Sequence, residues 1–487
     1  MKVLKEILQG VKVLNSINTS GKSVAAIEFD SRKVQKGSLF VAQKGVSVDG
    51  HKFIDKAIGL GASVIVCEEL PDVLNEELTF VLVEDSNVAL AKIASNFYGN
   101  PSSKLKLVGV TGTNGKTTVA TLLYELFQKA GYKTGLLSTV KIRIGQKNFE
   151  ATHTTPDSVS INKYLSKMVA AGVTHCFMEV SSHGVHQKRT EGLQFDGGVF
   201  TNLSHDHLDY HKTFAEYRDV KKKFFDDLSK DAFALVNSDD KNGTVMLQNT
   251  KARKATYSLR SMADYKVKII EKGFTGMLMT LNGQEIWVRL IGDFNAYNLS
   301  AIFGVADLLG LESLEVLTLI SQLESVDGRF EYKISKSGIV TIVDYAHTPD
   351  ALKNVLETIQ GVRTGKENLI TVVGCGGDRD NSKRPKMGNI ASVLSDQVVF
   401  TSDNPRFEDP QEILNQVESG VQAEYVKKTL SILDRKQAIK TACKFAQKGD
   451  ILLIAGKGHE TYQDIKGVKH HFDDKEVVEE ILNELEK

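Results

Sequence analysis

The 487-residue chain lacks the features that would place it in several specialised classes of protein. Its 61 basic residues balance 61 acidic residues, so no chain-wide charge favours nucleic acid or an anionic membrane as a partner. No apolar run approaches the ~20 residues that span a bilayer. The charged segment 1–8 predicts an amphipathic helix and not a signal peptide. We therefore expect a cytoplasmic protein with neither a nucleic-acid nor a membrane partner.

Cysteine is also scarce, and its spacing excludes two kinds of site. Cys67, Cys176, Cys375 and Cys443 are far apart and form no Cys-x-x-Cys pair. Neither a zinc knuckle nor a disulfide framework is indicated. Because three of these residues lie in or beside apolar strands, we expect reduced and buried thiols.

Two breaks divide the chain into three units. The loop-like segment 98–103 contains one of only 7 prolines. A second break at 327–329 separates a helical stretch, 298–323, from a strand-like run, 339–343. A length of 487 residues suits about three domains of ~150 residues each. We predict domains at residues 1–102, 103–328 and 329–487.

Short apolar runs alternate with helical patterns in the second and third units, which is typical of a mainly parallel α/β sheet. Each run is followed by a loop rich in Gly, Asp or Asn, and ligands bind at these carboxyl ends of strands. The fold class is therefore α/β. We expect a central sheet of the P-loop ATPase type, a Rossmann-like C-terminal domain and a small N-terminal α/β domain. The predicted strands are 105–110, 175–180, 199–203, 232–236, 370–373, 397–401 and 451–455.

The most informative motif is Gly112-Thr113-Asn114-Gly115-Lys116-Thr117-Thr118. It lies between an apolar strand and a helix that we expect to stop at Gly131, so its backbone N–H groups can hold phosphate oxygens. Lys116 is placed to reach the terminal phosphates and the Thr117 hydroxyl to bind Mg²⁺. Val110 stands where the full P-loop pattern has glycine, so the loop is a shortened variant. The motif predicts binding of a nucleoside triphosphate.

Acidic and histidine side chains lie at the ends of two predicted strands that follow one another in the sequence. Glu179 ends the first strand, as is typical of a Mg²⁺ ligand beside phosphates. The second strand runs into His205, Asp206, His207 and Asp209, and six of the 12 histidines lie between residues 175 and 211. A zinc site would also suit His-x-His with Asp and Glu. We favour Mg²⁺ because the phosphate loop requires it, although any single histidine is as well explained by a core or loop hydrogen bond.

Two further groups of charged residues differ in what they indicate. The run 221–225, Lys-Lys-Lys-Phe-Phe, is by default a solvated helix face.

Three loops of the last unit, at 374–380, 403–406 and 456–460, each follow an apolar strand. Together they offer arginines for a carboxylate and acids for an ammonium group. They predict a zwitterionic, amino-acid-like ligand, with loop salt bridges as the alternative for each loop alone.

These motifs together resemble the Mur ligase family along the whole chain. Members of that family are ATP-dependent enzymes that add amino acids to the cytoplasmic peptidoglycan precursor. The segments 30–32, 37–42 and 152–156 resemble the members that add the third residue. Asp403-Asn404-Pro405-Arg406 is similar to the motif of those that take meso-diaminopimelate, since lysine-adding relatives usually lack the arginine. The motifs that carry the family resemblance are 112–117, 178–183, 202–209, 295–298 and 344–347.

The resemblance implies a reaction in which meso-diaminopimelate is joined to the D-Glu side-chain carboxylate of UDP-MurNAc-L-Ala-D-Glu. ATP would first convert that carboxylate to an acyl phosphate. The implied setting is the bacterial cytoplasm, with small molecules as the only partners, Mg²⁺ as cofactor and a monomeric chain. The alternatives are a lysine-adding member, a folylpolyglutamate-synthase-like ligase, and a nucleotide-binding switch or scaffold without enzymatic activity.

The resemblance also implies a role for individual residues. Lys116, Lys221 and His207 would be catalytic, with Lys221 modified by CO₂ to a carbamate, and Thr117, Glu179 and His207 would bind metal. Besides residues 112–118, the nucleotide contacts would be Asn298, Arg329 and Asp344. The UDP-MurNAc-dipeptide contacts would be Ser31, Thr154, Thr155, Ser181, Gln187 and Arg189. The diaminopimelate contacts would be Arg379, Asp403, Asn404, Pro405, Arg406, Gly456 and Glu460.

Overall fold

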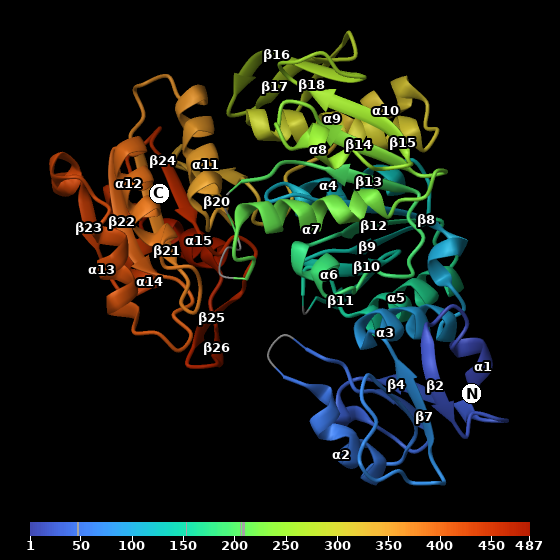
Figure 1. The fold of residues 1–487 in the computed structure, drawn as a ribbon. Helices are drawn as coiled ribbons and strands as arrows, with labels where there is room; N and C mark the ends of the chain where they lie inside the picture. Colours follow the sequence, from blue (N-terminus) through green and yellow to red (C-terminus); the bar gives the residue numbers. More distant parts are fainter. Residues whose placement is uncertain (46–47, 152, 205, 207–209) are drawn as a thin grey trace.

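The computed structural model describes residues 1–45, 48–151, 153–204, 206 and 210–487. These residues form three successive large sheets, which lie in three parts of the molecule in Figure 1: blue, cyan to yellow, and orange to red. The predicted α/β class is confirmed. Within the described ranges, no helix is both long and apolar enough to cross a membrane.

The N-terminal part is a five-stranded sheet in which only the edge strand β2 runs antiparallel to its neighbour. Helix α3 (Ser86–Phe97) packs on one face and α2 (Ile54–Gly59) on the other. The strands, in spatial order, are β2 (Val13–Ile17), β7 (Thr79–Val83), β6 (Ala62–Cys67), β5 (Ser38–Val41) and β4 (Ala26–Glu28). Smaller elements are β1 (Lys2–Val3), α1 (Leu4–Ile7), β3 (Ser23–Val24) and three 3₁₀ turns, Ser31–Lys33, Gly50–Phe53 and Pro101–Lys104.

The central sheet has eleven strands, of which β9 through β16 in spatial order run parallel. Antiparallel strands extend it at both ends. In spatial order the strands are β11 (Lys147–Glu150), β10 (Lys141–Ile144), β9 (Thr134–Leu137), β12 (His175–Glu179), β8 (Lys106–Thr111), β13 (Gly197–Phe200), β14 (Phe233–Asn237), β15 (Arg253–Ser258), β16 (Tyr265–Gly273), β17 (Gly276–Leu281) and β18 (Gln284–Val288).

Helices cover both faces of the central sheet, which explains why its strands are continuous apolar runs. In β8, Val108 and Val110 pack toward one layer of helices and Leu107 toward the other. The first layer consists of α4 (Lys116–Lys129), α9 (Asp293–Leu308) and α10 (Ser313–Ile320). The second consists of α5 (Ser158–Ala170), α6 (Ser182–His186), α7 (Phe214–Asp226) and α8 (Gly243–Met246).

The C-terminal part is a six-stranded sheet, parallel except for its edge strand β19. In spatial order its strands are β19 (Glu331–Ile334), β20 (Val340–Asp344), β24 (Ile451–Ala455), β21 (Leu369–Cys375), β22 (Gln397–Ser402) and β23 (Thr429–Ser431). One face carries α11 (Pro349–Val362), α12 (Lys383–Leu394) and α13 (Pro410–Glu418), and the other α14 (Arg435–Phe445) and α15 (Asp474–Glu484). A 3₁₀ turn, Ala423–Lys428, and a hairpin, β25 (Tyr462–Ile465) with β26 (Val468–His471), complete this part.

Most of the predicted elements are present, with three corrections. The predicted N-terminal helix is shortened to α1, because Val3 pairs with Ser23 as part of a small sheet. The helical stretch 298–323 is two helices, α9 and α10, separated at Gly310, whose φ is +90°. The strand expected at 199–203 ends at Phe200, because Thr201 and Asn202 turn to bond the phosphate loop.

The four cysteines are free and buried, as expected. Burial raises the pKa of Cys67 and of Cys375 to about 11, so both thiols are protonated and unreactive at neutral pH.

A buried ion pair holds helices and strands of the C-terminal part together. Arg435 of α14 and Asp474 of α15 have fully buried side chains 2.7 Å apart. The guanidinium also donates to the carbonyl oxygens of Ser402 and Ala455, which end β22 and β24. The pair therefore ties two helices to the carboxyl ends of two strands.

We predict that Arg435→Met destabilises this part by about 3–5 kcal/mol, because it leaves the Asp474 charge buried without a partner. Hydrogen exchange of β22 and β24 measures the loss of protection. Lys436→Met is the matched control, since its ion pair with Glu480 is half exposed and such pairs contribute about 0–1 kcal/mol. Equal effects of the two substitutions would contradict this role.

Candidate active site

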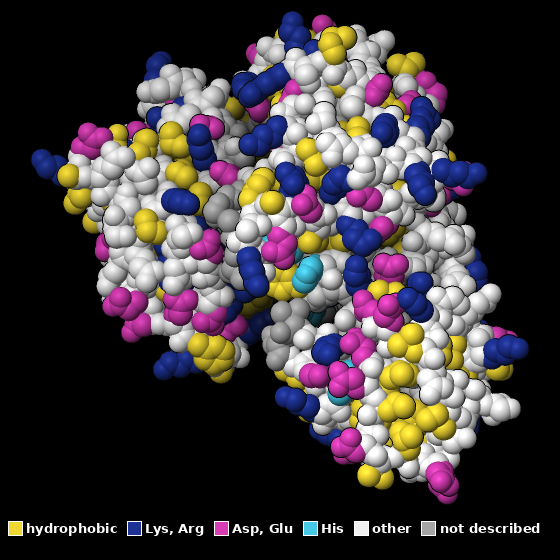
Figure 2. Space-filling model, in the orientation of Figure 1, with side chains coloured by type: hydrophobic (Ala, Val, Ile, Leu, Met, Phe, Trp, Pro, Cys, Tyr) yellow, Lys and Arg dark blue, Asp and Glu magenta, His cyan; other side chains and the backbone are white. Residues whose placement is uncertain are grey.

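The central and C-terminal sheets direct the loops at the carboxyl ends of their strands into one cavity of about 310 Å³. A hollow between the parts of the molecule is visible in the space-filling view (Figure 2). The central part contributes Thr113, Asn114, Gly115, Lys116, Thr117, Thr139, Thr154, Glu179, His183 and Asp206. The C-terminal part and its junction contribute Arg329, Tyr345, His347, Gly376, Arg379, Asp380, Lys383, Asp403, Asn404, Arg406, Gly456 and Glu460.

The phosphate loop joins β8 to α4 as the sequence predicts. Residues that follow the neighbouring strand β13 hydrogen-bond to the loop and fix its conformation. The Asn114 N–H donates to Asn202 Oδ1 over 3.0 Å, and Thr201 Oγ1 donates to the Asn114 carbonyl over 2.6 Å. Gly112 has φ +147°, and a Cβ there would lie 1.9 Å from Thr201 Oγ1. Glycine is required at this position because the chain following β13 packs directly against the loop.

Lys116 is partly buried at the start of α4, and its ammonium group lies over the loop. Its Nζ donates to the carbonyl oxygens of Gly112 and Thr113, at 2.9 and 2.7 Å. Burial lowers the pKa of Lys116, while the carboxylates of Glu179 and Asp206 act in the opposite direction. The loop thus presents a cation to the cavity, where terminal phosphates need one.

Glu179 ends β12 and points into the same cavity, with only 1% of its surface exposed. Its two carboxylate oxygens accept from the N–H and hydroxyl of Thr139, at 2.7 and 3.2 Å. Thr117 also lines the cavity, and its hydroxyl accepts from Arg329 over 3.2 Å. Hydroxyl and carboxylate oxygens are the hard donors that Mg²⁺ prefers, so these two residues fit the predicted metal.

The other residues of the predicted metal site lie outside the described part of the chain. They are His207 and its neighbours His205 and Asp209. Among the residues that the structure describes, no group of three or more His, Cys, Asp or Glu side chains is arranged to hold a metal ion.

Lys221 is not on a solvated helix face, contrary to the default interpretation of its lysine run. It is 1% exposed, and Lys222 is also buried. The Lys221 Nζ donates to the Gly112 carbonyl over 2.9 Å and to Thr111 Oγ1 over 3.3 Å, directly beneath the phosphate loop. Burial, together with the charge of Lys116, lowers the pKa of Lys221 well below its ordinary value. The neutral form of the Lys221 amine is thus favoured relative to an exposed lysine.

A second cavity of about 430 Å³ adjoins the phosphate loop and contains the three remaining predicted nucleotide contacts, Asn298, Arg329 and Asp344. Arg329 lies at the junction between the two sheets and stacks 4.5 Å from the Tyr345 ring centre. Asp344 ends β20, and burial raises its pKa to about 6. The aromatic side chains of Phe294, Tyr297 and Tyr257 also line this cavity.

The residues predicted to hold the UDP-MurNAc-dipeptide form a hydrogen-bonded chain behind Glu179. Thr155 Oγ1 donates to the Glu179 carbonyl over 2.9 Å and accepts from the Ser181 N–H. Arg189 donates to the Thr155 carbonyl over 2.6 Å and to Gln187. Of the predicted set, Thr154 lines the main cavity, whereas Ser31 lies in the N-terminal part and lines neither cavity.

The C-terminal loops meet as the sequence predicts. Asn404 Nδ2 donates to Glu460 Oε2 over 2.7 Å, and Arg406 donates to the Gly377 carbonyl over 2.6 Å. Gly456 has φ +117°, and a Cβ there would lie 2.5 Å from Asp403 Oδ2. Pro405 is buried between Asn404 and Arg406, and Arg379 is exposed at the cavity edge.

Sequence reasoning missed several residues of the site. Tyr345 and His347 line both cavities, and they stand inside the motif 344–347, of which only Asp344 had a predicted role. Burial lowers the pKa of His347 to about 4, so its ring is neutral at pH 7. Thr139 holds Glu179, yet nothing in the sequence around it indicates this.

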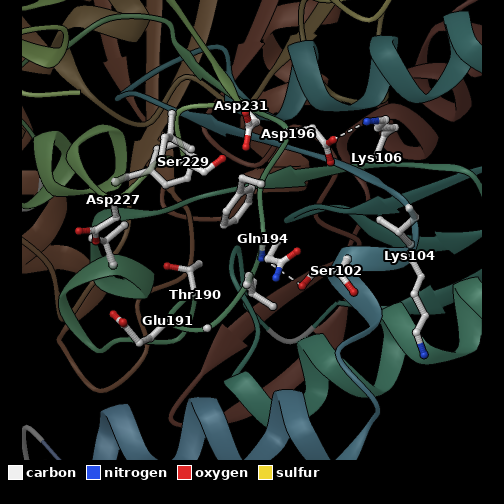
Figure 3. A pocket seen from close by; sticks show the side chains of 18 of the residues that line it. Ser102, Lys104, Lys106, Thr190, Glu191, Gln194, Asp196, Asp227, Ser229 and Asp231 are labelled. Atoms are coloured by element: carbon white, nitrogen blue, oxygen red, sulfur yellow. Dashed lines mark hydrogen bonds and ion pairs between the residues drawn. The ribbon is translucent and has the colours of Figure 1, made fainter. Parts of the chain in front are cut away.

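A third, larger cavity lies at the opposite end of the central strands. It has a volume of about 850 Å³ and is lined by residues of the segments 102–106 and 188–196 and by the end of α7 (Figure 3). Figure 3 shows the Lys106–Asp196 ion pair, at 2.8 Å, and the bond from the Gln194 N–H to Ser102. None of the predicted site residues lines this cavity.

Comparison with known proteins agrees with the geometry. Three family models match the chain in turn: "Mur ligase family, catalytic domain" over residues 23–98, "Mur ligase middle domain" over 110–306, and "Mur ligase, glutamate ligase domain" over 328–458. The UDP-N-acetylmuramoyl-L-alanyl-D-glutamate–2,6-diaminopimelate ligase of Cytophaga hutchinsonii is 58% identical over 99% of this chain and 100% of its own length. The chain belongs to the Mur ligase family.

Further relatives support the same grouping within the Mur ligases. The ligase of the same name from Phocaeicola vulgatus is 55% identical over 98% of this chain and 99% of its own. A solved structure of such a diaminopimelate ligase is 31% identical, with a TM-score of 0.70 and 100% of both chains covered. The likeness therefore extends over all three sheets.

We predict that Gly112→Ala weakens nucleotide binding at least ~10-fold, because the methyl group would displace Thr201 and distort the phosphate loop. Isothermal titration calorimetry with ADP measures the dissociation constant of the nucleotide. Gly131→Ala is the matched control, since Gly131 also has positive φ but a Cβ there would meet no atom within 4 Å. Unchanged ADP affinity in Gly112→Ala would contradict the loop assignment.

Proposed function

We propose that this Mur ligase joins meso-diaminopimelate to the D-Glu side-chain carboxylate of UDP-MurNAc-L-Ala-D-Glu, with conversion of ATP to ADP and phosphate. The observation that carries the proposal is the single cavity in which Lys116 and Glu179 face Asn404 and Arg406. Phosphate-binding and amino-acid-binding groups share it, so activation of the acid and attack by the amine can occur in one place. The names of these three relatives, all diaminopimelate ligases, support the choice of substrates.

In the first step the D-Glu carboxylate oxygen attacks the γ-phosphorus of ATP, and ADP leaves. The product is an acyl phosphate, which supplies the leaving group that a free carboxylate lacks. The phosphate loop holds the phosphate oxygens through its N–H groups, and the Lys116 ammonium neutralises charge that develops on them. Arg329, which bonds Thr117 across the junction, adds a second cation from the C-terminal side.

In the second step the amine of diaminopimelate attacks the acyl carbon, and phosphate leaves from the tetrahedral intermediate. Arg406 and Arg379 are suited to the carboxylate at the far end of the amino acid, and Asp403 and Glu460 to its ammonium group. L-Lysine lacks that far carboxylate and would leave the arginines without a partner. This is the physical basis for preferring diaminopimelate.

We further propose that Thr117, Glu179 and His207 hold Mg²⁺. When bound, the metal would offset phosphate charge and polarise a phosphoryl oxygen. The fit rests on the hard oxygen donors of Thr117 and Glu179, which line the same cavity as Lys116.

We also propose domain boundaries between residues 102 and 103 and between 328 and 329. The first lies in the turn Pro101–Lys104 that leads into β8. At the second, Gly328 has φ +65° and packs against the backbone of His459. The N-terminal domain, with Ser31, would bind the UDP-sugar, and the chain of Thr154, Thr155, Ser181, Gln187 and Arg189 would bind the dipeptide.

Phosphate release tests the proposed function. With ATP and UDP-MurNAc-L-Ala-D-Glu present, we expect turnover when meso-diaminopimelate is added and little or none with L-lysine. Turnover with L-lysine but not with meso-diaminopimelate would contradict the role given to Arg406. A slow release indifferent to both substrates would indicate a nucleotide-binding switch, and acceptance of a folate substrate with glutamate would indicate the folylpolyglutamate-synthase-like alternative.

We propose that CO₂ modifies Lys221 to a carbamate. Carbamylation requires a neutral amine, and burial of Lys221 beside the phosphate loop lowers the pKa of its amine, which favours that form. We expect Lys221→Ala to be nearly inactive and to regain part of its activity with short-chain carboxylic acids, which replace the anionic oxygens. Steady-state phosphate release measures both effects, with Lys223→Ala, two positions along the helix and partly exposed, as the control. Full activity of Lys221→Ala would contradict the carbamate.

A further inference from the structure

A buried lysine lies behind the amino-acid end of the cavity and has no role so far. Lys457 follows Gly456 after β24 and has a fully buried side chain. Its Nζ lies 3.1 Å from Asn404 Oδ1, 3.3 Å from Glu460 Oε2 and 3.7 Å from Asp403 Oδ1. Lys457 itself is not among the residues that line the cavity, although all three of its partners are.

We propose that Lys457 is a positioning residue: it fixes the orientation of the Asn404 amide and, as a neighbouring cation, holds Asp403 and Glu460 ready to receive the ammonium group of the incoming amino acid. This inference rests on the proposed function, since it concerns the same amino-acid pocket.

The Asn404 amide is held in one of its two orientations. Its Oδ1 accepts from the Lys457 ammonium and, at 2.8 Å, from the Asp464 N–H of β25. Both donors require oxygen at that position, because neither can accept a hydrogen bond from an NH₂ group. The Asn404 NH₂ group is therefore directed to Glu460 Oε2, at 2.7 Å. Without Lys457, one of the two contacts that select this orientation is lost.

Lys457 also compensates for two carboxylates that lie close together. Burial and the neighbouring Asp403 raise the pKa of Glu460, whereas Lys457 and Asn404 act to lower it. The other charged and titratable groups that interact with these acids include Arg435 of α14, which is paired with Asp474, and Tyr345, which follows β20. Tyr462 of β25 also lies nearby, with its ring centre 5.6 Å from the Lys457 Nζ. Removing the Lys457 charge should raise the pKa of Glu460 further, and a protonated Glu460 is a poorer partner for an ammonium group.

The test is Lys457→Met, which keeps the buried length of the side chain and removes its charge. We expect the KM for meso-diaminopimelate to rise about 10- to 100-fold, the range for losing a hydrogen bond to a charged group. The KM for ATP should be nearly unchanged. In the pH profile of kcat/KM for diaminopimelate, the loss of activity toward acid should begin at a higher pH than in the unmodified enzyme. Lys457→Arg should restore part of the affinity.

Lys469→Met is the matched control. The Lys469 Nζ lies 4.0 Å from the centre of the same Tyr462 ring but is on the exposed face of β26. We expect no change in either KM. If Lys457→Met changes the KM for ATP and for diaminopimelate equally, or leaves the pH profile unshifted, the positioning role is wrong. If the unmodified enzyme does not use diaminopimelate at all, the proposed function itself is wrong. That result is distinct from failure of the positioning role, which shows only in the Lys457→Met variant.

Discussion

The site depends on one geometric constraint, which is that two mainly parallel sheets direct the carboxyl ends of their parallel strands at the same cavity. In a parallel sheet the loops after successive strands gather at one edge. Here β8, β12 and β13 of the central sheet bring the phosphate loop, Glu179 and the chain after Phe200 to that edge. The strands β20, β21, β22 and β24 do the same from the C-terminal sheet. Neither sheet alone holds both the groups that we propose bind phosphate and those that we propose bind the amino acid.

Cationic side chains that the protein holds in place make this arrangement chemically workable. A ligase of this family brings phosphates and carboxylates together, and their mutual repulsion must be offset in a site that excludes water. Lys116 and Arg329 lie where the phosphates are expected, and Lys457 lies behind the two acids of the proposed amino-acid pocket. Each is held by carbonyl, hydroxyl or carboxylate oxygens, so its position is set before any substrate binds.

The sequence predicted the fold well where local patterns decide the structure. Apolar runs with a glycine-rich loop and a helix after them predicted β8 and α4, and β24 has the predicted bounds. The sequence predicted less where contacts between residues far apart in the chain decide the structure. The strand at β13 ends early because Thr201 bonds the phosphate loop about 90 residues away in the chain, and Lys221 is buried because α7 packs beneath that loop. Lys457 could not be singled out, since only the folded structure places it between Asn404, Asp403 and Glu460.

The central claim is that the phosphate of ATP is transferred to the substrate carboxylate inside the shared cavity. It is tested most directly with UDP-MurNAc-L-Ala-D-Glu carrying ¹⁸O in the D-Glu side-chain carboxylate. The account predicts that the inorganic phosphate released during ligation contains one ¹⁸O atom from that carboxylate. Phosphate without the label, formed while diaminopimelate is joined to the peptide, would contradict an acyl phosphate and with it the role assigned to the cavity.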